Sequence, residues 1–225
     1  MQYEQPVDPE EITDDIGSLL VKVARQSVEH YFKNKSRMPV PNGLPSMVYR
    51  PGAAFVTIES YYPDGKSELR GCIGYIEPIK PLIKTIIDVS LEAAFNDPRF
   101  YPLREKELNS VTFEVSVLSK LEEAPRDKNG RLEFIVIGRD GLVAERGFNR
   151  GLLLPQVPVE NLWDKETFLS ETCLKAGLWP DCWLDNKTKI YRFRAMAWKE
   201  YKPKGDVIRR DLSKEYEELI KINKT

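Results

Sequence analysis

Two extended runs joined by a tight turn constrain this chain most strongly, because they commit part of its first half to an antiparallel hairpin. Residues 55–62 are mainly β-branched and aromatic, as is typical of a strand. Residues 63–65 (Pro-Asp-Gly) are a turn signal, and a second extended run follows. The sequence therefore predicts a β-hairpin over residues 53–77.

The second strand of this hairpin carries the best chemical signal, the run Leu-Arg-Gly-Cys-Ile-Gly at residues 69–74. If side chains alternate, Arg70, Cys72 and Gly74 share one face of the strand. A neighbouring guanidinium lowers the pKa of a cysteine, so Cys72 is a candidate nucleophile or redox thiol and Arg70 its activator. Gly71 and Gly74 leave room for a ligand to approach the backbone. The alternative is that Cys72 is a small buried hydrophobic residue.

Residues after this hairpin supply a second set of candidates. Asp97 and Arg99 follow a predicted helix, and Glu114 lies on a predicted strand. Together with Arg70 they could bind an anionic ligand or position a proton-transfer group, or they could form a structural network of ion pairs. Gln156 follows a proline and could bond either to a ligand or to the backbone of its own loop.

The remaining patterns predict strands grouped in hairpins with helices between the groups. Apolar residues recur at helical spacing after Thr13 as far as Lys33, and again from Pro81 to Asn96. The further predicted elements are a strand at 111–118, a hairpin from 134–138 and 141–145, a strand at 151–156, a helix at 163–175, a strand at 190–198 and a short helix after 200. This order predicts an α+β fold with a mostly antiparallel sheet.

Composition excludes several classes of protein. The 225 residues carry a net charge of −1, which gives no overall attraction to nucleic acid or to anionic membranes. No apolar run is long enough to span a bilayer. His30 is the sole histidine, which excludes a histidine-rich metal site, and no metal or cofactor is predicted. The three cysteines (Cys72, Cys173 and Cys182) are too few and too scattered for a disulfide framework.

Domain boundaries follow from composition. Residues 1–13 are acidic and carry no base, so we expect a flexible arm and not a targeting peptide, and hence a cytoplasmic protein. Residues 14–200 form the main domain, in one or two lobes, and residues 201–225 form a peripheral segment.

Several motifs in this order resemble the AMMECR-type domain family, named after a human chromosomal region linked to Alport syndrome, midface hypoplasia and elliptocytosis. The matching runs are residues 69–74, 97–100 (Asp-Pro-Arg-Phe), 114–118 (Glu-Val-Ser-Val-Leu), 153–157 (Leu-Leu-Pro-Gln-Val) and 173–178 (Cys-Leu-Lys-Ala-Gly-Leu). Cys173 is typical of the prokaryotic form. The resemblance covers about residues 14–200.

The resemblance implies an intracellular α+β protein and does not supply a reaction, because the family has no assigned biochemical activity. It further implies a modification pathway shared with Memo-type and radical S-adenosylmethionine proteins in prokaryotes, whereas the human relative resembles a scaffold. Two hypotheses follow. The chain is either an enzyme with Cys72 and Arg70 in a cleft, or a non-catalytic module that binds an unidentified ligand or protein partner.

Overall fold

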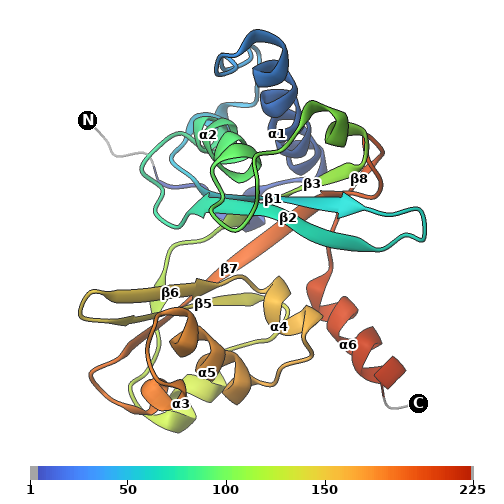
Figure 1. Cartoon of the computed structure of the whole chain (residues 1–225). Coiled ribbons are helices and arrows are strands. Elements are labelled where there is room, and N and C mark those ends of the chain that lie inside the picture. Colours follow the sequence, from blue (N-terminus) through green and yellow to red (C-terminus); the bar gives the residue numbers. More distant parts are fainter. Residues whose placement is uncertain (1–4, 224–225) are drawn as a thin grey trace. The chain divides into compact units, whose positions relative to one another are not determined.

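The computed structural model describes residues 5–223, which form two compact units (Figure 1). The first unit comprises the chain up to Ser119 together with Met196–Arg210. The second comprises Lys120–Ala195 and the chain from Asp211 onward. Strand β7 (Lys189–Glu200) contributes residues to both units. The domain boundaries expected from composition, at residues 13 and 200, stay a prediction.

The first unit is a sheet with helices packed on one face. Its elements are η1 (Pro9–Glu11), α1 (Asp14–Asn34), η2 (Ser46–Tyr49), β1 (Ala53–Tyr61), β2 (Ser67–Tyr75), α2 (Leu82–Phe95), η3 (Glu105–Asn109), β3 (Val111–Leu118), the end of β7 and β8 (Val207–Arg209). The strands lie in the order β2-β1-β3-β7, and β8 pairs with β7. Helices α1 and α2 lie side by side over β1–β3 (Figure 1). Strand β2 stands at the end of the strand order and is therefore an edge strand.

The second unit is a smaller sheet with its own helices. Its elements are β4 (Glu122–Glu123), α3 (Lys128–Phe134), β5 (Asp140–Arg146), β6 (Asn149–Leu153), α4 (Gln156–Glu160), α5 (Lys165–Lys175), η4 (Pro180–Leu184), the start of β7 and α6 (Leu212–Asn223). Strand β5 pairs with β6 on one side and β7 on the other, and β4 pairs with β7. Because the strand pairs in both units are antiparallel, the predicted α+β class is confirmed.

Helices α1 and α2 begin and end where their sequences predict. Oγ1 of Thr13 accepts a hydrogen bond from the Ile16 N–H, which caps the first turn of α1. Helix α2 begins directly after Pro81 and its last residue is Phe95, with Asn96 as the C-cap. It cannot continue through Asp97, because a residue that precedes a proline is restricted to extended conformations. Both helices bury apolar stripes in the core of the first unit.

The acidic N-terminal segment is packed where it is described, so the expected flexible arm is wrong for residues 5–12. Val7 and Ile12 are buried in the core of the first unit. The Val7 N–H donates to the Pro51 carbonyl at 2.8 Å, and Arg50 pairs with Glu11. Two apolar side chains in the run thus outweigh its acidic composition. Residues 1–4 lie outside the described residues.

The second predicted hairpin is displaced along the chain. We expected strands at 134–138 and 141–145, but the hairpin joins β5 to β6. Residues before β5 form helix α3, whose first turn is capped by Asp127 accepting from the Gly130 N–H. The carboxylate of Asp140 accepts from the Val136 N–H, so this apolar run closes a loop instead of pairing as a strand.

The cysteines of the second unit also correct an expectation. Cys173 at the end of α5 and Cys182 in η4 form a disulfide, with their Cα atoms 6.0 Å apart. Between them Gly177 has a φ of +72°, in the left-handed region that favours glycine. This turn reverses the chain so that η4 packs on α5. Spacing alone does not reveal this reversal.

None of the helices within residues 5–223 is long and apolar enough to cross a membrane.

Candidate functional site

Arg70 stands out of register at the centre of the predicted motif. Ile58 of β1 pairs with Gly71, but the next residue, Glu59, pairs with Leu69, so Arg70 has no partner on β1. Such a bulge redirects a side chain and interrupts strict alternation. The expectation that Arg70 and Cys72 share a face as neighbours in a regular strand is therefore wrong.

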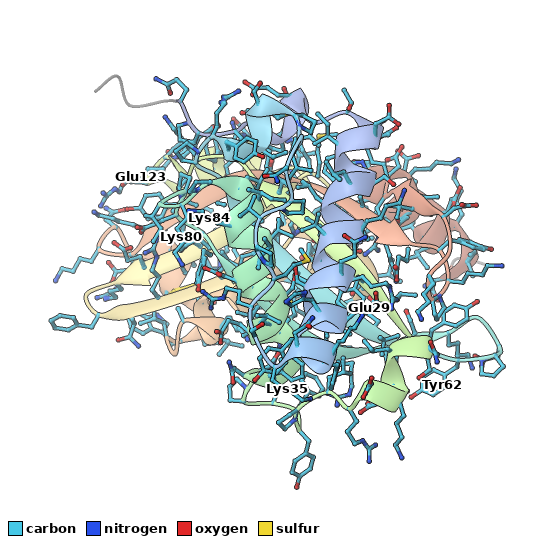
Figure 2. All side chains as sticks on the ribbon, turned by 90° about the horizontal axis from the view of Figure 1, so that it is seen from above. Glu29, Lys35, Tyr62, Lys80, Lys84 and Glu123 are labelled. Carbon is cyan, nitrogen blue, oxygen red and sulfur yellow. A yellow bond between two sulfur atoms is a disulfide. The ribbon has the colours of Figure 1, made fainter. Side chains whose placement is uncertain are left out.

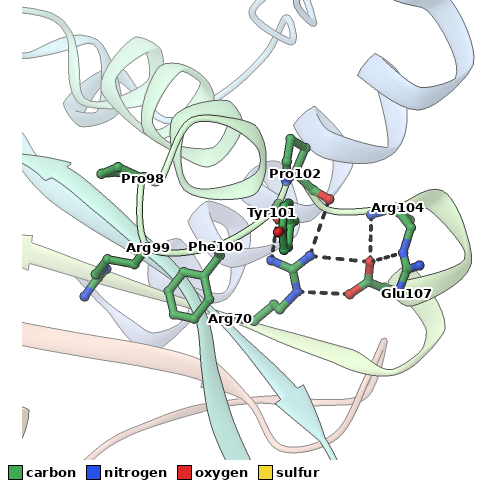
Figure 3. Close-up of a pocket in the computed structure, with 8 residues that line it drawn as sticks. All are labelled: Arg70, Pro98, Arg99, Phe100, Tyr101, Pro102, Arg104 and Glu107. Carbon is green, nitrogen blue, oxygen red and sulfur yellow. Dashed lines mark hydrogen bonds and ion pairs between the residues drawn. The ribbon is translucent and has the colours of Figure 1, made fainter.

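The bulge directs Arg70 to the segment that follows α2. Its guanidinium forms a double contact with Glu107, with Nε donating to Oε1 at 3.0 Å and Nη2 to Oε2 at 3.4 Å. Nη1 and Nη2 also donate to the carbonyls of Tyr101 and Pro102, at 2.9 and 3.4 Å (Figure 3). Arg70 thus ties the edge strand to the loop that precedes η3.

Asp97 and Arg99 bind the open edge of β2 at Cys72. The Cys72 N–H donates to Oδ2 of Asp97 at 2.9 Å, and Nη2 of Arg99 donates to the Cys72 carbonyl at 3.1 Å. Arg99 also contacts both carboxylate oxygens of Asp97, at 2.9 and 2.7 Å. These two side chains satisfy backbone groups that a further strand would otherwise bind.

The same contacts set the protonation of two carboxylates. Hydrogen bonds from Arg99, acting against partial burial, lower the pKa of Asp97 to about 2. Burial opposes the charged form of Glu107, but hydrogen bonds from Arg70 and Arg104 outweigh it and lower the pKa of Glu107 to about 2. Both groups are therefore acceptors, not acids, near neutral pH.

Arginine side chains from β2 and from the loop between α2 and η3 line one pocket of about 890 Å3 (Figure 3). Its walls are Arg70, Pro98, Arg99, Phe100, Tyr101, Pro102, Arg104 and Glu107. Nε of Arg104 donates to Glu107 at 3.1 Å, on the other side of that carboxylate from Arg70. Among the residues that the structure describes, Nη1 of Arg99 and both Nη atoms of Arg104 have no hydrogen-bond partner.

The surroundings of the Cys72 thiol favour its neutral form. Burial raises the pKa of Cys72 to about 11, against a hydrogen bond from Thr57 and the charge of Arg99. The Thr57 hydroxyl, opposite Cys72 on β1, donates to Sγ at 3.2 Å. The expected lowering by Arg70 is thus wrong, since the guanidinium that acts on the thiol belongs to Arg99 and its effect is smaller than that of burial.

The chain itself fills the space left by both motif glycines. A Cβ at Gly71 would lie 2.1 Å from the Ala93 carbonyl oxygen, so this glycine lets α2 approach the sheet. A Cβ at Gly74 would lie 2.3 Å from the Phe55 ring and 2.5 Å from the Ala54 carbonyl oxygen. Neither glycine therefore opens a gap for a ligand on its side-chain face.

Glu114 is joined to Cys72 by strand register. Cys72, Thr57 and Glu114 occupy facing positions on β2, β1 and β3. The buried Glu114 carboxylate accepts from Arg210 at 3.0 Å. The structure thus brings Cys72, Asp97, Arg99 and Glu114 into one region of the first unit, with Arg70 at its edge.

Gln156 lies elsewhere in the chain, at the start of α4 in the second unit, where it is buried. It stays a predicted site residue. Among the described residues, no group of three or more histidine, cysteine, aspartate or glutamate side chains is placed to hold a metal ion.

Sequence reasoning missed four contributors: Thr57, Tyr101, Arg104 and Glu107. The sequence contains a signal for Thr57, because the predicted hairpin places this residue near Cys72 on the neighbouring strand. The other three lie just after the recognised run at residues 97–100, in a segment whose polar composition carries no signal of its own.

The fold and the site define an α+β protein with a cationic surface pocket. Arginine–carboxylate contacts hold its edge strand, and the pocket beside this strand contains guanidinium N–H donors that have no partner among the described residues. A family model, AMMECR1, matches residues 21–198. The chain belongs to the AMMECR1 family, which confirms the resemblance inferred from its motifs.

Similar proteins come from archaea. A protein of Aeropyrum pernix is 45% identical over 210 residues, covering 93% of this chain and 90% of its own length. A protein of Thermococcus onnurineus is 46% identical over 203 residues, covering 89% and 98%. The crystal structure of the uncharacterised protein PH0010 from Pyrococcus horikoshii is 43% identical, with a TM-score of 0.85 over 89% of this chain and 99% of that one.

Proposed function

We propose that this protein binds a small organic anion in the pocket lined by Arg70, Arg99 and Arg104. One observation carries the proposal: two guanidinium groups are anchored by carboxylates, yet each keeps unused N–H donors. Arg99 is held by Asp97, and Arg104 by Glu107. Planar guanidinium groups bind carboxylates and phosphates through two parallel hydrogen bonds, so preorganised donors of this kind favour an anionic ligand.

Size and aromatic content support an organic ligand. The volume of about 890 Å3 lies within the range of small-molecule sites. The Tyr101 side chain is 90% exposed, so its ring is free to cover a bound molecule. The lining holds three guanidinium groups and one carboxylate, and Asp97 behind Arg99 offsets one more positive charge. One net positive charge is left to pair with the ligand.

The raised pKa of the half-buried Cys72 thiol favours binding over covalent chemistry. A nucleophilic cysteine needs a substantial thiolate fraction near neutral pH, whereas the pKa of Cys72 is raised to about 11. The proposal therefore gives Arg70 and Cys72 positioning roles, Arg70 through Glu107 and Cys72 through its backbone contacts with Asp97 and Arg99. Gly71, Gly74, Glu114 and Gln156 are not part of this pocket.

Three finer statements are proposals that rest on the family resemblance or on composition alone. They are a role in a modification pathway with Memo-type and radical S-adenosylmethionine proteins, a role as a scaffold, and a cytoplasmic location. Anion binding is compatible with either role.

A titration followed by amide NMR tests the proposal, with inorganic phosphate and citrate as probes. We expect saturable shifts at residues around the pocket, and a loss of affinity of about fivefold in Arg104→Gln and in Arg99→Gln. Arg209→Gln is the matched control, because this half-exposed arginine of the same unit does not line the pocket. The proposal fails if neither probe saturates, or if Arg209→Gln weakens binding as much as Arg104→Gln does.

A further inference from the structure

A groove separate from the arginine pocket runs along the first turns of α2. Its volume is about 540 Å3, and it lies between the loop that follows α1 and the loop that precedes α2. The lining residues are Arg37, Met38, Pro39, Val40, Ile79, Lys80, Pro81, Lys84, Ile87 and Asp88. None of them lines the arginine pocket.

The apolar side chains that line the groove differ in how deeply they are buried. Ile87 is buried in the core and forms its deepest apolar part, and Met38 and Val40 are half-buried against that core. Ile79 stands at the rim with 73% of its surface exposed. Pro39 and Pro81 fix the backbone φ angle at one position in each of the two walls, which lowers the conformational freedom of the groove. Preformed apolar grooves of this kind bind partners at low ordering cost.

Positive charge surrounds this apolar surface. Arg37 and Lys80 share one carboxylate, with Nη1 and Nζ lying 3.1 and 2.6 Å from the oxygens of Asp88. Lys84, which lies close to Lys80 in Figure 2, has no ion pair with any residue in the described range. The groove therefore carries three cations and one anion, in a chain whose overall charge is −1.

We propose that this groove docks a short segment of a partner protein that carries acidic side chains on both sides of an aliphatic one. The aliphatic side chain packs against Ile79 and Val40, and the flanking carboxylates pair with Lys84 and Arg37. The complementarity in charge selects the acidic segment over other apolar ones. Three cations are fewer than the clusters of four to eight that bind anionic lipid headgroups, which disfavours a membrane as the occupant.

The test uses the full chain and the peptide acetyl-Glu-Asp-Leu-Ile-Asp-Glu-amide, titrated while amide NMR spectra are recorded. We expect saturable shifts confined to the loops and helix turns around the groove. Lys84→Glu should weaken binding about fivefold, because it replaces an attraction by a repulsion. Ile79→Ser should weaken it about tenfold, through loss of buried aliphatic surface.

Matched controls separate this groove from general charge effects. Lys22→Glu changes an exposed lysine of α1 that does not line the groove, and should leave the affinity unchanged. The peptide with glutamine and asparagine in place of its acids should bind much more weakly. Equal binding of that neutral peptide, or no effect of Lys84→Glu, would overturn the proposal. So would absence of peptide binding together with Lys84-dependent binding to phosphatidylglycerol vesicles.

Discussion

Cys72 illustrates how opposing effects of its surroundings set the pKa of a single side chain. Its backbone is fastened by Asp97 and Arg99, and its thiol accepts a hydrogen bond from Thr57. The hydrogen bond and the cation favour the thiolate, whereas burial disfavours it by more, and the pKa rises to about 11. A cysteine beside an arginine in the sequence is therefore not reactive by that fact alone.

Alkylation of Cys72 is expected to be slow at neutral pH. Since Cys173 and Cys182 are joined, Cys72 is the one free thiol among residues 5–223. The rate with iodoacetamide should rise with pH towards an apparent pKa near 11, because only the thiolate reacts. The same protein in denaturant supplies the reference rate. A native rate at pH 7 above that reference would show an activated thiol.

The motif at residues 69–74 also shows which structural features a local sequence pattern predicts and which it does not. Alternation correctly predicts the hairpin of β1 and β2, because extended backbone and turn residues are local properties. It does not predict the bulge at Arg70, whose side chain contacts Glu107 far along the chain. Nor does it reveal that Ala93 and Phe55 occupy the space beside Gly71 and Gly74. A glycine in the sequence indicates that another group lies close to the backbone, but it does not identify that group.

At the scale of elements, the junction of α5 and η4 depends on a covalent link. The disulfide between Cys173 and Cys182 closes a short loop around the turn at Gly177. Both cysteines are buried in the core of the second unit. Arg146 lies over the Trp179 ring at 4.6 Å, which adds a second contact to this loop. The link therefore holds η4 on α5.

Reduction of this disulfide should destabilise the second unit. Closing a loop of this length contributes about 2–3 kcal/mol by restricting the unfolded chain. We expect Cys182→Ser to lower the free energy of unfolding by about that amount, measured by denaturant titration with hydrogen exchange assigning the loss to the second unit. The Cys72→Ser variant is the control and should keep the stability gained from the bond. A dithiol reductant that leaves wild-type stability unchanged would contradict the expectation.

Helix α3 shows why some elements escape prediction. Its sequence is polar and contains Gly130, which favours a loop over a helix. Its stability comes from distant groups: the buried Arg131 donates to the carbonyls of Pro125, Trp183 and Thr188. A guanidinium enclosed by backbone carbonyls is a tertiary feature, so no local pattern predicts it. Elements with strong apolar periodicity, such as α1 and α2, are predicted because their burial is visible in the sequence itself.

At the scale of the whole molecule, stability in acid depends on carboxylates that are fastened by arginine and lysine in the first unit. The pKa of Asp97 and that of Glu107 are lowered to about 2. Burial opposes the ionised form of Glu59, but Lys199 outweighs it and lowers that pKa as well. A group whose pKa is lower in the folded state stabilises the fold above its unfolded pKa and loses this effect as pH falls towards the folded value. The contribution is therefore complete above about pH 4.5 and vanishes towards pH 2.

Part of the loss of folding stability at acid pH should come from Glu107. We expect Glu107→Gln to lower the free energy of unfolding by about 1–2 kcal/mol at pH 7, because it weakens the contacts with Arg70 and Arg104. The difference from wild type should shrink as pH falls from about 4.5 to 2, since Glu107 takes up a proton over that interval in the unfolded state, whereas its lowered pKa keeps it ionised in the folded state until about pH 2. Glu105→Gln, two residues earlier in η3, is the control and should follow the wild-type curve. Denaturant titrations across this range measure the effect. A constant difference at every pH would mean that Glu107 acts through its shape and not its charge, and the electrostatic account of the pocket wall would then be wrong.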